Sequence, residues 1–354
     1  VISESMPHLQ SVAIGIFIGT GSRHEVESEA GISHFLEHLP FKGTPKRPEP
    51  NLISGVIESV GGVINALTDR EYTCYWIKVS RDNFGLALDI LADMVQNPLM
   101  EVGEIEKERL VILEELSMIN DSPDAKAEQM VEEQLWPNQA MGRDIGGTKS
   151  SVSRISRQNL IDYHQHQYTA NNIVVSVAGN VTHEAVLEAV HHKLGAMPVG
   201  SPITWQPINP SKNDEAPVVL EYRRTDQAHM CLAFPGVSFN DPRRYAVSLV
   251  NTIIGEGQAS RLFTEIRERN GLAYEVSSSA SFYRDCGSVI IYCGVNPSKA
   301  KDALHGMLLE LDKLQMDITQ EDLKRAVDYT RGRMLLRLED SGEVMSSLGR
   351  QAIL

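Results

Sequence analysis

The stretch G-I-S-H-F-L-E-H-L-P-F-K-G-T, from Gly31 to Thr44, places two histidines and a glutamate in one short apolar segment. Its residues predict a buried helix from about Gly31 to Leu39, and Pro40 limits the extension of that helix. His34 and His38 are four residues apart, so they share one helix face. Polar groups in an apolar stripe cost stability unless they have partners. The segment therefore indicates either histidines that are hydrogen-bonded in a core or two ligands of one metal ion.

Zinc is the metal that this spacing suits, because neutral imidazoles at positions i and i+4 can chelate one ion. Glu37 lies beside the same face, where a carboxylate would stand next to water at the metal. The order H-x-x-E-H is the inverse of H-E-x-x-H and follows the same physical logic. A catalytic zinc site also needs a third protein ligand and one open position.

The later segment E-K-E-R-L-V-I-L-E-E-L-S-M, residues 106–118, offers candidates for the third ligand. Glu108 and Glu115 are seven residues apart, so they nearly superimpose on a helical wheel. Their stripe is otherwise apolar, and carboxylates there are costly unless they are paired or bind a metal. Glu114 falls on a different, charged side of the helix. We therefore expect Glu115 or Glu108 to be the ligand and Glu114 to face solvent.

Apolar periodicity around these segments predicts a mixture of strands and helices. Strands are expected at 11–22, 63–80 (two strands and a turn) and 171–181. Helices are expected at 51–62, 83–97, 101–120, 155–170 and 183–197.

The second half of the chain repeats the first. At an offset of 217 residues, Ala13–Arg23 aligns with Met230–Asn240, and both read as a strand followed by a turn. The copy has no histidine, glutamate or cysteine at the positions of the H-x-x-E-H motif. A stretch rich in Pro, Ser and Asn separates the halves. The predicted fold class is α+β, with two homologous domains at 1–200 and 217–354, a linker at 201–216, and in each domain an antiparallel sheet with helices on one face.

Composition and charge argue against some classes of function, such as nucleic-acid binding and membrane spanning. The chain has 354 residues and a formal net charge of −14, without a block of Lys and Arg, so no nucleic-acid partner is expected. The acidic charge can attract basic peptides, or it can serve solubility alone. The four cysteines form no C-x-x-C pair, which favours a reducing compartment. No apolar run is long enough to span a membrane. The sequence starts at Val1 without a methionine, so a targeting peptide stays an open question.

Three motifs together resemble the inverted-zincin metallopeptidases of the pitrilysin family (M16), in particular its bacterial branch similar to the mitochondrial processing peptidase (M16B). They are H-F-L-E-H-L-P-F-K-G-T, G-G-V-I-N-A-L-T-D-R-E-Y-T-C-Y and S-R-L-F-T-E-I-R-E-R-N-G-L-A-Y, which begin at His34, Gly61 and Ser260. The resemblance covers nearly the whole chain and implies the fold of LuxS/MPP-like metallohydrolases. It also implies a chain that is incomplete at both ends.

The resemblance assigns roles at the metal. It implies that His34, His38 and Glu115 ligate one zinc ion per chain. Glu37 would be the general base that activates water there, and Glu108 would orient a histidine ligand. These roles define a zinc metalloendopeptidase.

The resemblance also assigns substrate contacts and partners. It implies that the substrate is an unfolded peptide or presequence-like segment added as a strand beside Asn65 and Ala66. Arg267 and Tyr274 would hold the substrate carbonyl. In the family, two such two-domain halves enclose a chamber, and the Arg/Tyr pair of one half reaches the zinc site of the other. Because this chain supplies one half, the resemblance implies a homodimer with composite active sites. The expected location is the bacterial cytoplasm, or the mitochondrial matrix for a eukaryotic chain.

Two alternatives stay open. The family contains non-catalytic structural or assembly subunits, which usually lose part of H-x-x-E-H, whereas here the motif is complete. The family also contains heterodimers that divide the zinc motif and the Arg/Tyr pair between chains, whereas this chain holds both. A site of this kind can also take cobalt or manganese.

Overall fold

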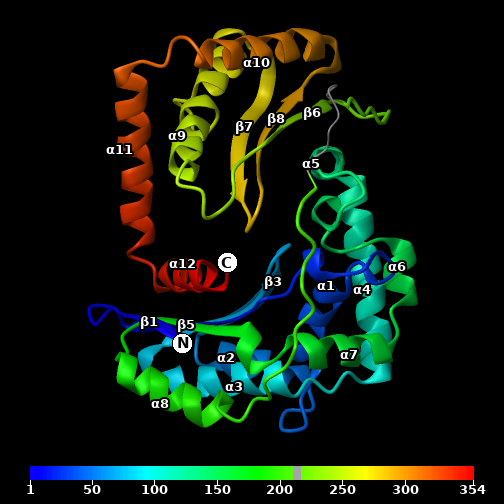
Figure 1. Ribbon diagram of the computed structural model, residues 1–354, viewed down its shortest axis with the longest axis vertical. Coiled ribbons are helices and arrows are strands. Elements are labelled where there is room, and N and C mark those ends of the chain that lie inside the picture. Colours follow the sequence, from blue (N-terminus) through cyan, green and yellow to red (C-terminus); the bar gives the residue numbers. More distant parts are fainter. Residues whose placement is uncertain (210–216) are drawn as a thin grey trace. The chain divides into compact units, whose positions relative to one another are not determined.

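The computed structural model describes residues 1–209 and 217–354, which form two compact units (Figure 1). The first unit comprises Val1–Ser117, Arg143–Gln206 and Leu336–Leu354. The second comprises Met118–Gly142 and Pro207–Leu335. The chain therefore passes from one unit to the other more than once.

A five-stranded sheet forms the centre of the first unit, in the order β1-β5-β2-β4-β3. Its strands are β1 (Ile2–Ser5), β2 (Ser11–Ile18), β3 (Val63–Thr68), β4 (Thr73–Ser80) and β5 (Ile173–Gly179). All pairs are antiparallel except β1 with β5, which is parallel. The expected antiparallel sheet is therefore present, with one added parallel strand at one edge and β3 at the other.

Among the described residues, eight α-helices have all or most of their length in the first unit. They are α1 (Ile32–His38), α2 (Ser54–Ser59), α3 (Phe84–Gln96), α4 (Val102–Asp121), α6 (Lys149–Arg154), α7 (Arg157–Gln167), α8 (His183–Leu194) and α12 (Ser341–Ile353). Among the described residues, α12 alone packs on the sheet face opposite to α1 and α3.

Strand β2 is buried on both faces because of this arrangement. Ile14 and Ile16 belong to the large core that includes the helices α1, α3, α7 and α8. Ala13 and Phe17 point the other way and pack against Met345 of α12. The continuous apolar run of this strand follows from burial on both sides.

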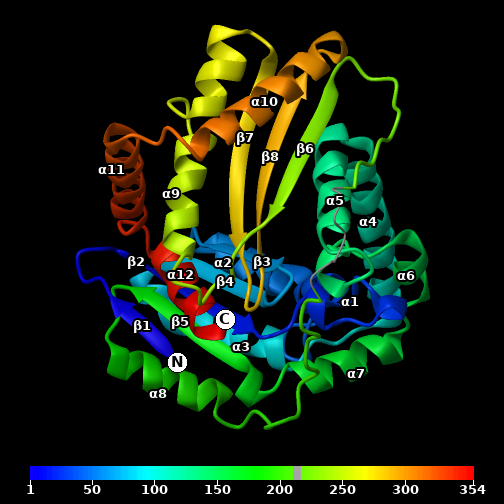
Figure 2. The ribbon, with the colours of Figure 1, turned by 45° about the horizontal axis from the view of Figure 1, so that its top comes forward.

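The second unit is built on a three-stranded antiparallel sheet in the order β6-β8-β7 (Figure 2). Its strands are β6 (Ala228–Pro235), β7 (Ala273–Phe282) and β8 (Gly287–Val295). Its helices are α5 (Pro123–Leu135), α9 (Arg244–Ile254), α10 (Ala300–Leu314) and α11 (Gln320–Arg337), together with a π-helical turn at Phe263–Arg269. Their core is apolar and includes Ile254, Ile266 and Ile291.

The doubling expected from the sequence is visible in matching elements. β2 and β6 have eight residues each and begin 217 residues apart, at Ser11 and Ala228. α5 and α12 have 13 residues each and begin at Pro123 and Ser341.

These two matching helices are exchanged between the units. α5, from the first half of the sequence, packs on β6 in the second unit. α12, from the second half, packs on β2 and β5 in the first unit. The contacts thus divide the chain differently from the boundaries 1–200 and 217–354 that the sequence predicts. Residues 210–216 of the expected linker lie outside the described residues.

Candidate metal centre

Helix α1 carries the histidine motif and is anchored at both ends by buried side chains. Gly31 precedes it with φ of 93°, a conformation that favours glycine. The Glu25 carboxylate accepts hydrogen bonds from the backbone N–H groups of Gly31 and Ser33, both at 2.8 Å. At the other end the Tyr75 hydroxyl donates to the Leu36 carbonyl oxygen at 3.1 Å. These contacts fix the position of a helix that is only seven residues long.

Three side chains converge beside this helix. The Nε2 atoms of His34 and His38 are 3.4 Å apart. Glu115 reaches the pair from α4, and its Oε2 lies 3.7 Å from Nε2 of His34 and 3.8 Å from Nε2 of His38. Each of the three residues offers one ligand atom, and these atoms lie within 4.8 Å of one another, as the ligands of one metal ion would.

The triangle fits one zinc ion. Tetrahedral zinc, about 2.0–2.1 Å from each ligand, separates neighbouring ligand atoms by roughly 3.4 Å. Glu115 Oε2 is buried and has no hydrogen-bond partner among the described residues. A buried carboxylate oxygen of this kind is costly unless a cation faces it. Three protein ligands would also leave the open fourth position of a catalytic site.

Glu108 orients the second histidine. Its Oε2 lies 3.0 Å from Nδ1 of His38, and its Oε1 lies 2.7 Å from Nζ of Lys42. Burial alone would raise the pKa of Glu108, but the hydrogen bonds from His38 and Lys42 hold it below its usual value. The Glu108 carboxylate can accept the Nδ1 proton of His38, and in the neutral ring this tautomer leaves the Nε2 lone pair directed into the triangle.

The pKa values of the two histidines shift in opposite directions. Burial, with the nearby charge of His38, lowers the pKa of His34 to about 4, so this ring is neutral at pH 7. Burial also opposes the charged form of His38, but the hydrogen bond from Glu108 and the charges of Glu115 and Glu37 raise its pKa overall.

Glu37 lies beside the triangle without belonging to it. It is half-buried on α1, next to Thr68 at the end of β3. Burial raises the pKa of Glu37, and the contact with Thr68 opposes that shift. A carboxylate with a raised pKa near a metal site has the property of a general base.

Asn65 and Ala66 lie on β3, which pairs only with β4 among the described strands. The side-chain Oδ1 of Asn65 accepts a hydrogen bond from the Ala66 backbone N–H at 2.8 Å. This N–H therefore points away from β4, toward the open edge of the sheet.

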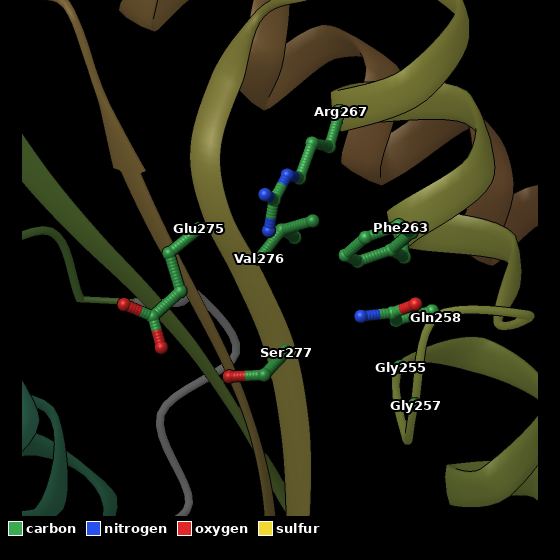
Figure 3. Close-up of a pocket in the computed structure, with 8 residues that line it drawn as sticks. All are labelled: Gly255, Gly257, Gln258, Phe263, Arg267, Glu275, Val276 and Ser277. Atoms are coloured by element: carbon green, nitrogen blue, oxygen red, sulfur yellow. The ribbon is translucent and has the colours of Figure 1, made fainter.

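Arg267 and Tyr274 come together in the second unit. The Arg267 guanidinium lies 4.8 Å from the ring centroid of Phe263 and 5.7 Å from that of Tyr274. Tyr274 is exposed, so this tyrosine is not a buried residue of the core. Arg267 also lines a surface pocket with Phe263 and Val276, and Gln258 and Ser277 add polar groups (Figure 3).

Sequence reasoning missed several residues around the centre. Lys42 lies four residues after His38 in the H-F-L-E-H-L-P-F-K-G-T segment. This helical spacing indicates that it lies on the same side as His38. Glu25 and Tyr75 act through contacts distant in sequence and gave no such signal. Glu114 is exposed and lies outside the cluster.

Comparisons with known proteins agree on one family. Residues 1–149 match the model described as insulinase (peptidase family M16), and residues 154–329 match the model described as the peptidase M16 inactive domain. The whole chain is 36% identical to an uncharacterised zinc protease of Streptomyces coelicolor, over 78% of that protein. It is also 34% identical to the uncharacterised zinc protease YmxG of Bacillus subtilis, over 86% of that protein. The chain therefore belongs to peptidase family M16, which confirms the resemblance.

Solved structures share the fold. A protease from Helicobacter pylori superimposes with a TM-score of 0.94 at 22% identity, and the match covers 99% of this chain and 86% of that one. A chain of complex III2 from Candida albicans superimposes with a TM-score of 0.85 at 19% identity, covering 99% and 82%. At these identities the likeness concerns the fold alone. Among the described residues no helix has the length and apolar character to cross a membrane.

Proposed function

We propose that this chain is a zinc-dependent endopeptidase that hydrolyses unfolded peptides or presequence-like segments. The observation that carries the proposal is the convergence of His34, His38 and Glu115 around one ion-sized position. The names of the M16 relatives, which are zinc proteases, agree with this activity. Zinc in this position would supply Lewis acidity, which polarises a carbonyl oxygen and makes water easier to deprotonate.

The protein's own residues carry the remaining steps. His34, His38 and Glu115 hold the ion, and Glu108 keeps the His38 ring in the tautomer that can bind it. Glu37 accepts a proton from the attacking water as the tetrahedral centre forms. It then returns that proton to the leaving amine as the peptide C–N bond breaks.

The substrate would bind as an additional strand on the open edge of β3. The outward Ala66 N–H is bonded to the Asn65 side chain in the free protein, and it would donate to the peptide backbone once that side chain turns away. The contact between Thr68 and Glu37 places the end of this strand next to the base. Only an extended chain can pair in this way, which favours unfolded substrates.

The test combines metal analysis with peptide hydrolysis. The purified protein should contain about one zinc per chain, and a chelator should abolish cleavage. His34→Ala and His38→Ala should lose the metal. Glu37→Gln should keep the metal and lose activity by on the order of 10²-fold or more. Full zinc retention in both histidine variants would reject the metal site, and wild-type cleavage by Glu37→Gln would reject the mechanism.

The same measurements address a non-catalytic structural or assembly role. A subunit of that kind would show no cleavage of any unfolded peptide, with or without zinc. Chelator-sensitive cleavage that disappears in Glu37→Gln would exclude it.

A further inference from the structure

His34 differs from His38 in what its second ring nitrogen contacts. Nδ1 of His38 faces the Glu108 carboxylate at 3.0 Å. Nδ1 of His34 is buried and has no hydrogen-bond partner in the described part of the chain. A histidine that binds a metal almost always donates its other N–H to a carboxylate, a carbonyl or water. His34 therefore needs such a partner.

A carboxylate lies close to this nitrogen, across a glycine. Asp144 opens a tight turn in which its Oδ1 accepts from the Gly146 N–H at 2.7 Å and its backbone oxygen accepts from Gly147 at 3.1 Å. A Cβ atom on Gly146 would stand 3.2 Å from Oδ1 of Asp144 and 3.8 Å from Nδ1 of His34. Gly146 therefore lies beside both the carboxylate oxygen and the ring nitrogen, and a side chain at this position would contact both.

We propose that Asp144 is the positioning residue of His34 and acts through one bridging water beside Gly146. The water would accept the Nδ1 proton of His34 and donate to Oδ1 of Asp144, and two polar partners are enough to hold a buried water. Each histidine ligand would then have its own carboxylate, with Glu108 in direct contact and Asp144 one water away. This inference rests on the proposed zinc site.

Two substitutions remove the bridge in different ways. Asp144→Asn removes the charge but keeps an oxygen that can accept from Gly146, so the turn is preserved. Gly146→Ala keeps the carboxylate and fills the water position with a methyl group. Residues that orient a metal ligand typically change metal affinity by about 10- to 100-fold when they are replaced. Each single variant should therefore bind zinc about 10-fold more weakly or worse.

The double variant separates this role from a packing effect. A Cβ on Gly146 would also stand 3.0 Å from Cδ2 of Leu116, the neighbour of Glu115. If Gly146→Ala acted through Leu116, its loss in zinc affinity would add to that of Asp144→Asn. If both substitutions disrupt the same bridge, their effects should not add. The double variant should then have the same zinc affinity as the single variant that binds zinc more weakly.

The experiment measures zinc dissociation constants by competition with a chromogenic chelator, using the whole 354-residue chain. Nitrogen-15 NMR of the zinc-loaded protein supplies a second readout, because the Nδ1 proton of His34 should exchange with solvent faster in both variants. Asp82→Asn and Gly85→Ala serve as matched controls, since Asp82 is exposed and nothing lies within 4 Å of a Cβ on Gly85.

Three outcomes decide the question. Unchanged zinc affinity in Asp144→Asn, or additive losses in the double variant, would overturn the role of Asp144 while leaving the zinc site standing. A wild-type protein that binds no zinc would overturn this inference and the proposed function together. Coupled losses in a protein that binds zinc but cleaves no peptide would support the bridge and reject only the peptidase activity.

Discussion

Glu115 and Glu114 are adjacent in sequence but lie in different surroundings on α4. Oε2 of Glu115 is buried near both histidines, whereas Glu114 is exposed. Glu115→Gln should lower zinc affinity by at least about 10²-fold, because it removes a charged ligand. Glu114→Gln should change the affinity by no more than about twofold, as is usual for an exposed site. Chelator competition measures both values, and equal effects would contradict the assignment of Glu115.

Among single residues, the sequence predicts the members of the proposed metal site, but it does not predict the residues that surround and position them. The spacing of His34 and His38, and the stripe shared by Glu108 and Glu115, follow from helical periodicity alone. The contact of Lys42 with Glu108 and the nearness of Asp144 to His34 depend on how distant segments pack. Periodicity within one segment carries no information about such contacts.

Among the elements, α1 depends on Glu25 for its N-terminal hydrogen bonds. Burial raises the pKa of Glu25 to about 7, although the N–H groups of Ser33 and Gly31 oppose the shift. In the unfolded chain this carboxyl ionises near its ordinary value of 4.5. Between these pH values the folded state holds a proton that the unfolded state has lost, so the free energy of unfolding falls as pH rises through this window.

Glu25→Gln isolates this contribution, since glutamine does not titrate. The free energy of unfolding of the wild type, minus that of Glu25→Gln, should fall by on the order of 1–3 kcal/mol between pH 4.5 and pH 7 and then level off. Urea denaturation at several pH values gives the difference. A difference that stays constant, or that rises with pH, would show that Glu25 is already ionised in the folded protein at low pH.

The open edge of β3 carries its own test. Asn65→Ala should speed hydrogen exchange at the Ala66 amide by about 2- to 10-fold, the range expected for one lost hydrogen bond. Asn65→Asp keeps an acceptor oxygen and should leave this amide slow. Mass spectrometry or NMR of the peptide-free protein can follow the exchange. The Leu67 amide, which points toward β4, is the internal control, and equal acceleration at both amides would indicate general fraying of the strand.

The sequence predicts long or strongly periodic elements and misses short or weakly apolar ones. α3 and α4 lie close to the expected helices at 83–97 and 101–120. β1 has four residues, and α5 contains no buried residue. Neither carries the apolar pattern on which such predictions depend, so their positions follow only from the packing of the whole chain.

At the scale of the whole molecule, the first unit holds the proposed metal ligands and the second holds Arg267 and Tyr274. If two chains share composite sites, Glu37→Gln chains mixed with Tyr274→Phe chains should recover activity, because each mixed dimer contains one intact site. The Tyr274→Phe variant must first be shown to have low activity by itself. Subunit exchange must also be demonstrated, by light scattering or with labelled chains. Demonstrated exchange without recovery would reject shared sites, and a fully active monomer would reject the dimer.

The doubled architecture is predictable from sequence, but the exchange of α5 and α12 is not. An offset of 217 residues between β2 and β6 is a property of the sequence. α5 and α12 have the same length, so their lengths do not indicate which half each helix packs against. That choice depends on tertiary contacts.

The exchange has a consequence for biosynthesis. Ala13 and Phe17 on β2 are covered by α12, whose residues leave the ribosome more than 300 positions later. At about 5–20 residues per second, that face of the sheet waits on the order of tens of seconds for its cover. The first half can form its larger core from its own residues, but the face that carries Ala13 and Phe17 lacks the cover of α12 until then. The nascent chain exposes this apolar face until α12 has been synthesised, so the packing of the face is a late step of folding.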